Sequence, residues 1–251
     1  HNTAAIESIG KTRTKDENGP QGLTAALTGG ASAMCYTSED VMAATFNVDL
    51  INDVGRCIGE DCLAMGYSGL YGPGINMHRT AYSGRNFEYY SEDPFVAGTI
   101  CAAEVQGIQS KGVAACPKHF AVNSQETRRM ASDSIVDERT LRELYLTGFE
   151  IVVKEARPKT IMTSYNLING TYANENAHLL QDILRKDWGF DGAVVTDWGG
   201  SNDHIRGVAA GSDLEMPTPG MDSARQLVKA MQDGKLSEEA ADACVDRMLE
   251  A

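Results

Sequence analysis

A carboxylate and a tryptophan directly follow a short apolar strand in the second half of the chain. The stretch Gly192-Ala193-Val194-Val195-Thr196-Asp197-Trp198-Gly199-Gly200 joins a β-branched run to two glycines, which permit a sharp turn. In an α/β barrel, a residue at the carboxyl end of a strand faces the pocket at the mouth of the sheet. Asp197 in that place has the chemistry of a nucleophile for glycoside cleavage, and Trp198 offers a face on which a sugar ring can stack.

An arginine lies in a loop rich in charged and aromatic residues, Gly84 to Pro94. The guanidinium of Arg85 presents a planar fork of donors that suits vicinal hydroxyls or a carboxylate. A structural ion pair between Arg85 and Glu88 or Glu92 is the alternative, because loop ion pairs often serve the fold alone.

Lys118 and His119 are adjacent at the end of a strand that begins at Val113. Neighbouring side chains of a regular strand point to opposite faces, so both reach a ligand only if the strand bends there. The alternative is a buried core histidine beside a solvated lysine.

Two further segments hold candidate ligand-binding residues. Tyr165, in Ile161 to Asn166, could bond to a carboxylate nucleophile or a ring oxygen, although tyrosine is also a common core residue. The segment Asp16 to Gly22 reads as a polar surface turn. Phosphate-binding glycine loops, a Gly-x-Ser-x-Gly elbow and metal-ligand spacings are absent from the sequence, so we expect neither cofactor nor metal. A carboxylate among hydrogen-bond donors suits acetal cleavage.

Alternating strands and helices must position these residues. Apolar strands are predicted at 68–71, 113–120, 160–166, 192–198 and 212–216, and amphipathic helices near 48–65, 94–110, 137–156, 177–188, 222–233 and 237–250. This alternation is typical of a parallel sheet with crossover helices. We therefore predict an α/β fold, a TIM-like (β/α)8 barrel over residues 1–251. Because only five or six strands are visible, the barrel is expected to be incomplete or irregular at its N-terminal units.

Composition narrows the class of protein. The 251 residues carry a formal charge of −13, which opposes nucleic-acid binding, and contain no apolar run of ~18 residues that could span a membrane. The six cysteines contain no Cys-x-x-Cys and are interpreted as buried reduced thiols, which favours the cytoplasm. Secretion is the alternative. Asn169-Gly170-Thr171 fits a glycosylation sequon, but such short matches are frequent by chance.

From about Gly19 onward the sequence resembles the N-terminal catalytic barrel domain of glycoside hydrolase family 3, β-glucosidase type. The resemblance rests on motifs that occur in the family's order: Gly72-Pro73-Gly74-Ile75-Asn76-Met77-His78-Arg79, Gly84-Arg85-Asn86-Phe87-Glu88, Ser91-Glu92-Asp93-Pro94, Gln109-Ser110-Lys111-Gly112-Val113, Lys118-His119-Phe120, Val136-Asp137-Glu138-Arg139, Met162-Thr163-Ser164-Tyr165-Asn166 and Val195-Thr196-Asp197-Trp198-Gly199.

The resemblance implies a retaining β-glycosidase that acts on β-linked glucose or a related sugar, with Asp197 as the nucleophile. Arg85, Lys118 and His119 match residues that bind hydroxyls of the sugar. The remaining matched positions are Tyr165 beside the nucleophile, Trp198 at the neighbouring subsite and Met162 close by.

The sequence departs from the family pattern at two points. Where the family commonly has Asp-Gly-Pro, this chain has Asn18-Gly19-Pro20, so a charge-assisted contact to a distal hydroxyl is lost or replaced, and β-xylosides become an alternative substrate. The general acid of such β-glucosidases is a glutamate from a second, α/β sandwich domain, which we expect to be absent from this chain and supplied by another segment or chain. A non-catalytic sugar-binding barrel and an inactive catalytic-domain fragment remain the other hypotheses.

Overall fold

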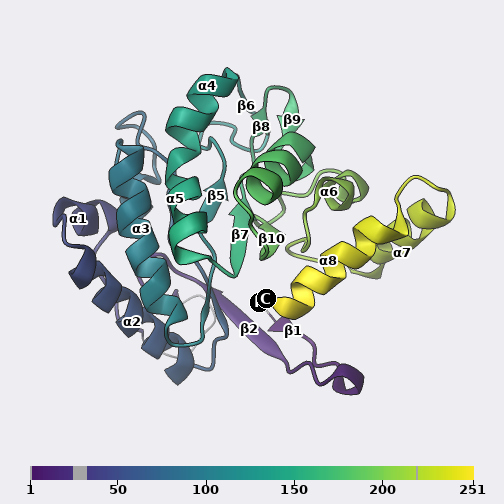
Figure 1. Cartoon of the computed structure of the whole chain (residues 1–251), viewed down its shortest axis with the longest axis horizontal. Coiled ribbons are helices and arrows are strands. Elements are labelled where there is room, and N and C mark those ends of the chain that lie inside the picture. Colours follow the sequence, from purple (N-terminus) through teal and green to yellow (C-terminus); the bar gives the residue numbers. More distant parts are fainter. Residues whose placement is uncertain (1, 25–32, 219) are drawn as a thin grey trace.

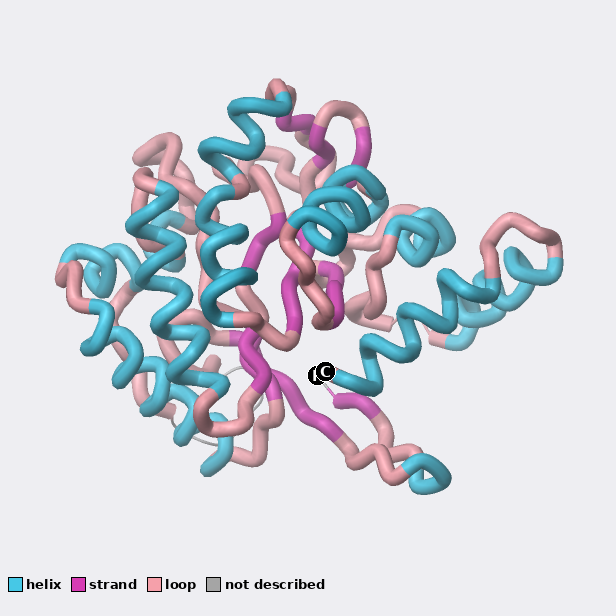
Figure 2. Tube along the Cα trace, viewed as in Figure 1, coloured by secondary structure: helices cyan, strands magenta, loops and turns pink. Residues whose placement is uncertain are grey.

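The computed structural model describes residues 2–24, 33–218 and 220–251 (Figure 1). A curved array of parallel strands lies at the centre, and helices cover its outer face (Figures 1 and 2). The strands of the array are β2 (Thr14–Asn18), β3 (Gly69–Tyr71), β4 (Ala114–Ala115), β5 (Lys118–Phe120), β7 (Thr160–Thr163) and β10 (Ala193–Thr196).

The strands form two sheets that share the segment 113–120. The first sheet has the order β1-β2-β3-β4 and the second has the order β10-β7-β5. The predicted single strand 113–120 is divided because Pro117 has no N–H to donate, yet Gly74 and Lys118 form a parallel bridge that joins the two sheets. A further parallel bridge between Val195 and Leu214 extends the array to the predicted strand at 212–216.

The array does not close into a regular eight-stranded barrel in the part of the chain that the structure describes. The edge of β2 that faces away from β3 pairs with the short antiparallel strand β1 (Asn2–Thr3). No strand pairing joins β2 to Leu214 among the described residues. Met248 and Ala251, at the end of the last helix, lie at this gap with Thr14 and Leu214. The prediction of a (β/α)8 barrel is therefore confirmed only in part. The structure shows a mixed α/β fold whose N-terminal edge is irregular.

All six predicted helices are present with nearly the expected bounds, and the one predicted at 137–156 is divided into consecutive α- and π-helical segments. They are α2 (Val48–Ala64), α3 (Pro94–Gln109), α4 (Glu138–Thr140), the π-helical η4 (Leu141–Tyr145), α5 (Thr147–Ala156), the π-helical η6 (His178–Asp187), α7 (Met221–Gln232) and α8 (Glu238–Glu250). Asp93 caps α3 and Asp137 caps α4, each through a side-chain oxygen that accepts backbone N–H groups. Two short helices, α1 (Glu39–Ala44) and α6 (His204–Ala210), were not predicted.

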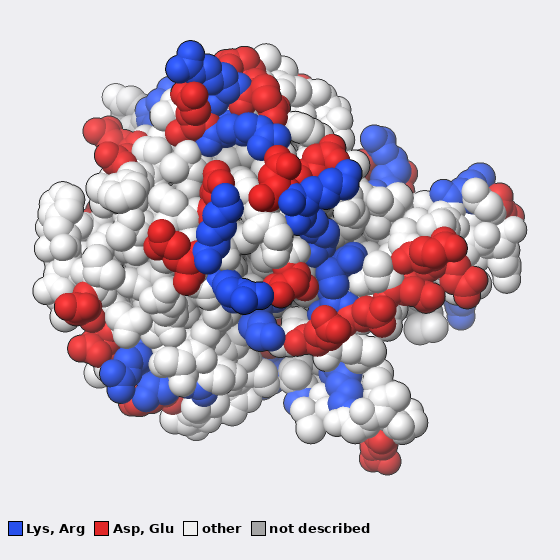
Figure 3. Space-filling view, viewed as in Figure 1, with Lys and Arg blue, Asp and Glu red and all other residues white. Residues whose placement is uncertain are grey.

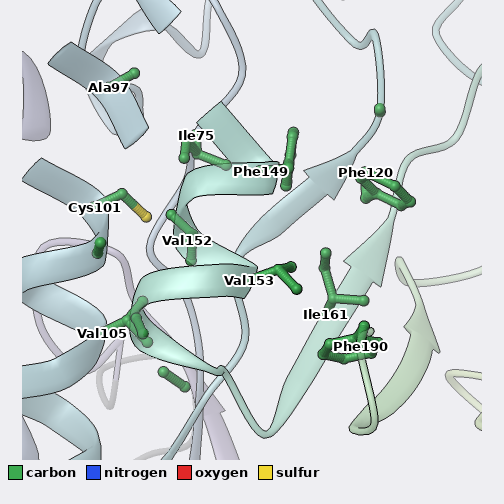
Figure 4. Packing of buried hydrophobic residues seen from close by; sticks show 14 of the residues in the cluster. Ile75, Ala97, Cys101, Val105, Phe120, Phe149, Val152, Val153, Ile161 and Phe190 are labelled. Atoms are coloured by element: carbon green, nitrogen blue, oxygen red, sulfur yellow. The ribbon is translucent and has the colours of Figure 1, made fainter. Parts of the chain in front are cut away.

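The main core lies between the strands and the layer formed by α2, α3 and α5. Figure 4 shows Phe149 and Val153 of α5 extending toward Phe120 and Ile161 of the sheet, while Val152 lies on the side of α5 that faces α3. The rings of Phe120 and Phe149 meet edge to face with their centroids 5.1 Å apart. This packing fixes the position of β5 and β7, whose carboxyl ends carry candidate site residues.

Smaller elements lie in the segments between the main strands and helices. The short strands β6 (Asp133–Ser134), β8 (Leu167–Ile168) and β9 (Thr171–Tyr172) form a separate sheet, and 3-10 turns occur at η1 (Glu7–Ile9), η3 (Asn86–Glu88) and η5 (Ala173–Glu175). Helices α7 and α8 project to one side of the molecule (Figure 1). In Figure 3 acidic side chains run along α8, while the rest of this face mixes both signs of charge. None of the helices in the described residues is long and apolar enough to cross a bilayer.

Two local predictions were wrong. The segment that contains Asp16 and Glu17 is not a surface turn but part of strand β2, because β1 and β3 flank it on both sides. Cys62, Cys101, Cys116 and Cys244 are buried free thiols, as predicted, but Cys35 and Cys57 are exposed. For Cys57 the reason is geometric, since it lies on the outer face of α2.

Candidate active site

Asp197 lies immediately after β10, whose four residues are all buried. The Oδ1 atom of Asp197 accepts a hydrogen bond of 2.6 Å from the backbone N–H of Trp198. Its Oδ2 atom is buried, has no hydrogen-bond partner within the described part of the chain and lies 3.5 Å from His119 Nε2. One carboxylate oxygen is therefore held in place while the other keeps its lone pairs uncommitted.

His119 is fixed by its backbone and its ring together. Its N–H donates to Asn76 Oδ1 at 2.7 Å, and its carbonyl accepts from Asn76 Nδ2 at 2.8 Å. The peptide bond before His119 is cis, and the strand register shifts between Lys118 and Phe120. The strand thus bends where the sequence analysis required it, and both Lys118 and His119 line the same cavity.

Arg85 determines the tautomer of His119. Arg85 Nη2 lies 2.7 Å from His119 Nε2, and because guanidinium can only donate, Nε2 is the acceptor and the ring proton lies on Nδ1. Burial, followed by the charges of Arg85 and Lys118, lowers the pKa of His119 well below its usual value. The histidine is accordingly neutral at physiological pH.

Arg85 also pairs with Glu88, so the structural ion pair considered in the sequence analysis is present. Burial lowers the pKa of Arg85, but Tyr89, Glu88 and Asp197 outweigh this effect and raise it overall. Arg85 is therefore a fixed cation that contacts Glu88 on one side and His119 on the other. Glu92, the other partner considered, is exposed.

Lys118 connects the ends of two strands. Its Nζ donates a hydrogen bond of 2.6 Å to Oδ1 of Asn18, the last residue of β2. Burial lowers the pKa of Lys118, while the charges of Glu88 and Asp197 oppose this shift. Asn18 is thus anchored by a lysine that is itself 3% exposed.

Two aromatic residues, Tyr165 and Trp198, lie next to each other beside Asp197. Tyr165 donates a hydrogen bond of 2.7 Å to the carbonyl of Trp198, and burial and the charge of Asp197 raise the pKa of Tyr165. The guanidinium of Arg129 lies 4.5 Å from the centre of the Tyr165 ring. The side chain of Trp198 is largely exposed at the rim.

These residues surround a cavity of about 360 Å³, which we call the catalytic cavity. Its lining includes every candidate from the sequence analysis except Tyr165, which lies against Trp198: Asn18, Arg85, Lys118, His119, Met162, Asp197 and Trp198, together with Tyr71, Arg129 and Met216. Asp197 is the only carboxylate that lines it among the described residues. No group of three His, Cys, Asp or Glu side chains in that part of the chain is arranged to hold a metal ion.

Two acidic residues elsewhere in the chain, Glu126 and Glu215, have partners of their own. Glu126 accepts hydrogen bonds from Arg129 at 2.7 Å and from Asn123 at 3.2 Å. Glu215 accepts one from Ser223 at 2.6 Å. These contacts give both carboxylates a structural place outside the catalytic cavity.

Sequence reasoning did not select Arg129 or Asn76. Arg129 lies in the polar run 124–131, which looks like a solvated loop, and its place in the cavity depends on the path of that loop. Asn76 belongs to a motif that carried the resemblance, but only the structure shows its two hydrogen bonds to the backbone of His119.

Comparison with known proteins identifies the family. The model of the glycosyl hydrolase family 3 N-terminal domain matches residues 21–251. The chain belongs to glycosyl hydrolase family 3. Thermostable β-glucosidase B of Acetivibrio thermocellus is 44% identical over 255 residues, which cover 98% of this chain and 34% of that protein.

Other family 3 relatives agree in fold and differ in named activity. An exo-α-(1→6)-L-arabinopyranosidase of Bifidobacterium longum is 40% identical over 254 residues, covering 98% of this chain and 33% of that protein. The structure of β-glucosidase 3B of Thermotoga neapolitana with glucose has a TM-score of 0.94 and 39% identity, and the match covers 99% of this chain and 36% of that one. The chain therefore spans about a third of the length of the curated relatives it matches.

Proposed function

We propose that this chain is the nucleophile-bearing domain of a retaining β-glycosidase that releases terminal β-linked glucose or a related sugar such as xylose. The observation that carries the proposal is the unpartnered Oδ2 of Asp197 in a cavity lined by hydrogen-bond donors. Membership of family 3 and relatives named β-glucosidase support the same reaction class.

In the first step, an oxygen of Asp197 forms a bond to the anomeric carbon of the sugar while the bond to the leaving oxygen breaks. The leaving oxygen takes a proton from a general acid, and the product is a covalent glycosyl-enzyme. Water then attacks the same carbon, gives up a proton to the group that had acted as the acid, and releases Asp197. Negative charge from Asp197 stabilises the oxocarbenium-like transition states of both steps.

The donors around Asp197 are suited to hold the hydroxyls of the sugar. Arg85 and Lys118 are cations whose positions are fixed by Glu88 and Asn18 respectively. Cation-to-hydroxyl hydrogen bonds are stronger than neutral ones, so they fix the sugar with its anomeric carbon at Asp197. The neutral His119 and the amide of Asn18 add uncharged contacts, and Trp198 at the rim provides a stacking surface for the departing group.

The general acid is proposed to come from a segment outside these 251 residues. A retaining glycosidase needs a second carboxyl group ~5–5.5 Å from the nucleophile. Among the described residues, only Asp197 brings a carboxylate into the catalytic cavity, and the relatives are about three times as long as this chain. A second domain or chain that brings a glutamate to the rim near Trp198 would complete the pair.

Substrates with different leaving groups test whether this chain supplies the nucleophile but not the general acid. A 2,4-dinitrophenolate departs without protonation, so the chain alone should release a burst of about one dinitrophenolate per molecule from dinitrophenyl β-glucoside and then turn over slowly. Methyl β-glucoside, whose leaving group needs an acid, should not react. The dinitrophenyl and methyl β-xylosides, tested in the same way, report whether the sugar must carry a hydroxymethyl group.

The Asp197→Ala variant is the control. No burst from the wild-type chain, with folded protein and sugar binding intact, would contradict the proposal and favour a sugar-binding barrel. Equal reaction of the methyl and dinitrophenyl glucosides would show instead that an acid lies within these residues.

A further inference from the structure

A second polar cavity, of about 470 Å³, lies beside the catalytic cavity, and the two have no lining residue in common. It lies between the loop 122–136, the start of the helix formed by α4 and η4, and Arg79 and Thr80 from the loop after β3. We call it the accessory cavity. It is at least as large as the catalytic cavity, so it has room for a molecule the size of one sugar ring.

Buried polar atoms in its lining lack partners. Asn166 is 1% exposed, and its Nδ2 donates to backbone carbonyls, but its Oδ1 accepts no hydrogen bond within the described residues. The hydroxyl of Ser124 is likewise buried and without a partner there. An unsatisfied buried polar group costs about 1–3 kcal/mol, so such atoms commonly mark the place of a bound molecule or ordered water.

The backbone of the lining departs from regular geometry in two places. Val122 has φ = 62°, a left-handed conformation that β-branched residues rarely adopt. The π-helical segment Leu141–Tyr145 ends at Tyr145, which also lines the cavity. Both features are concentrated at functional sites in proteins generally.

Side chains at the rim complete a set of contacts that a sugar uses. The guanidinium of Arg79 lies 5.9 Å from the centre of the Tyr145 ring and forms no ion pair among the described residues. The hydroxyl of Thr140 offers a donor and an acceptor, and Gln125 and Ser132, which share a hydrogen bond of 3.1 Å, offer their remaining donors and acceptors. Asp137 balances the charge of Arg79 in the lining, which disfavours an anion such as phosphate.

We propose that the accessory cavity is a binding site for a neutral polyhydroxylated molecule, in the class of a single sugar residue. On binding, the side chains of Asn166 and Ser124 turn toward the ligand so that its hydroxyl groups reach Asn166 Oδ1 and Ser124 Oγ, while Arg79 and Tyr145 hold its outer face. The site is independent of the reaction proposed for Asp197.

The loop that lines the accessory cavity also reaches the catalytic one. Asn123, in the accessory cavity, donates to Glu126, and Glu126 accepts from Arg129, which lines the catalytic cavity. Different parts of one loop therefore line the two cavities.

The test is a titration of the ¹⁵N-labelled chain with D-glucose, followed by the backbone amide signals in NMR spectra. Signals of Val136 and Thr140 report on the accessory cavity, and signals of His119 and Trp198 report on the catalytic cavity. We expect both sets to shift, with different dissociation constants. In Arg79→Ala the affinity at the accessory cavity should fall about tenfold, while the affinity at the catalytic cavity stays the same.

Two further variants make the result specific. Thr80 is exposed at the rim, so Thr80→Trp should obstruct the cavity without disturbing the core and abolish the accessory shifts. Arg139 is an exposed arginine that does not line the cavity, so Arg139→Ala should change neither affinity. The proposal would be overturned if the amide signals of the accessory cavity did not shift while those of the catalytic cavity did. An accessory-site affinity for glucose that is the same in Arg79→Ala as in the wild type would also overturn it. So would a glucose-soaked crystal in which the accessory cavity holds only ordered water.

Discussion

Two buried glutamates make the stability of this fold depend on pH. Glu39 of α1 and Glu104 of α3 are fully buried, and each has one carboxylate oxygen without a hydrogen-bond partner in the described residues. Burial and the charge of Glu104 raise the pKa of Glu39 to about 9, and burial raises the pKa of Glu104 to about 7. Glu39 also accepts a hydrogen bond from Gln21, which in turn donates to the carbonyl of Phe87, so the pair supports the segment that follows Asn18 and the loop that carries Arg85.

The sign and size of the effect follow from these values. The folded protein keeps a proton on Glu39 that the unfolded chain releases near its ordinary value of 4.5. A raised pKa contributes its full stability below the unfolded value and loses it as the pH rises toward the folded value. One retained proton is worth about 1.4 kcal/mol per pH unit, so the free energy of unfolding should fall by about 3 kcal/mol from about pH 6 to 8 on account of Glu39 alone.

Urea unfolding of the wild-type chain and of Glu39→Gln across this pH range measures the difference directly. The glutamine mimics the protonated carboxyl and cannot ionise, so the variant should lose less stability with rising pH and be the more stable protein at pH 8. Glu143→Gln, at an exposed position on η4, is the matched control and should follow the wild type. Parallel pH profiles for wild type and Glu39→Gln would refute the argument.

Three other substitutions test separate parts of the structure. Lys118→Met removes the hydrogen bond to Asn18, and calorimetric titration with glucose should show an affinity loss of about 1.5–3 kcal/mol; unchanged affinity would remove Lys118 from the site. Gly107→Ala places a Cβ atom 2.2 Å from the carbonyl oxygen of Asn52 where α3 crosses α2, and thermal unfolding should show a free energy of unfolding lower by about 1–3 kcal/mol or more. An unchanged stability would show that the two helices can move apart to accommodate the methyl group. Asp213→Ala leaves two arginines without their buried partner and should cost about 3–5 kcal/mol in urea unfolding, whereas a loss under about 1 kcal/mol would show that solvent compensates.

The sequence was sufficient to predict the strand that carries Asp197. A β-branched run that is closely followed by a carboxylate and two glycines predicts a strand that ends at a turn. In the structure β10 ends one residue before Asp197. The adjacent Lys118 and His119 could be assigned to one cavity only on the condition that the strand bends. That bend depends on hydrogen bonds from Asn76, which is more than forty residues away in sequence.

Features set by contacts between distant segments could not be predicted. Asn18 ends a strand whose polar sequence resembles a turn, and it becomes a strand only because β1 and β3 pair with it. Arg129 enters the catalytic cavity through the path of an irregular loop, for which periodicity gives no signal. In the described parts of the chain, the lack of strand pairing between β2 and Leu214 is likewise a property of the assembled sheet rather than of either segment.

Covalent trapping tests the central claim most directly. The chain is incubated with 2,4-dinitrophenyl 2-deoxy-2-fluoro-β-D-glucoside, whose fluorine slows hydrolysis of the intermediate and whose leaving group needs no acid. Mass spectrometry of the intact protein and of its peptides should show one fluoroglucosyl group, attached to Asp197, and no label on Asp197→Asn. A folded wild-type chain that stays unlabelled, or a label on any other residue, would contradict the assignment of Asp197 as the nucleophile.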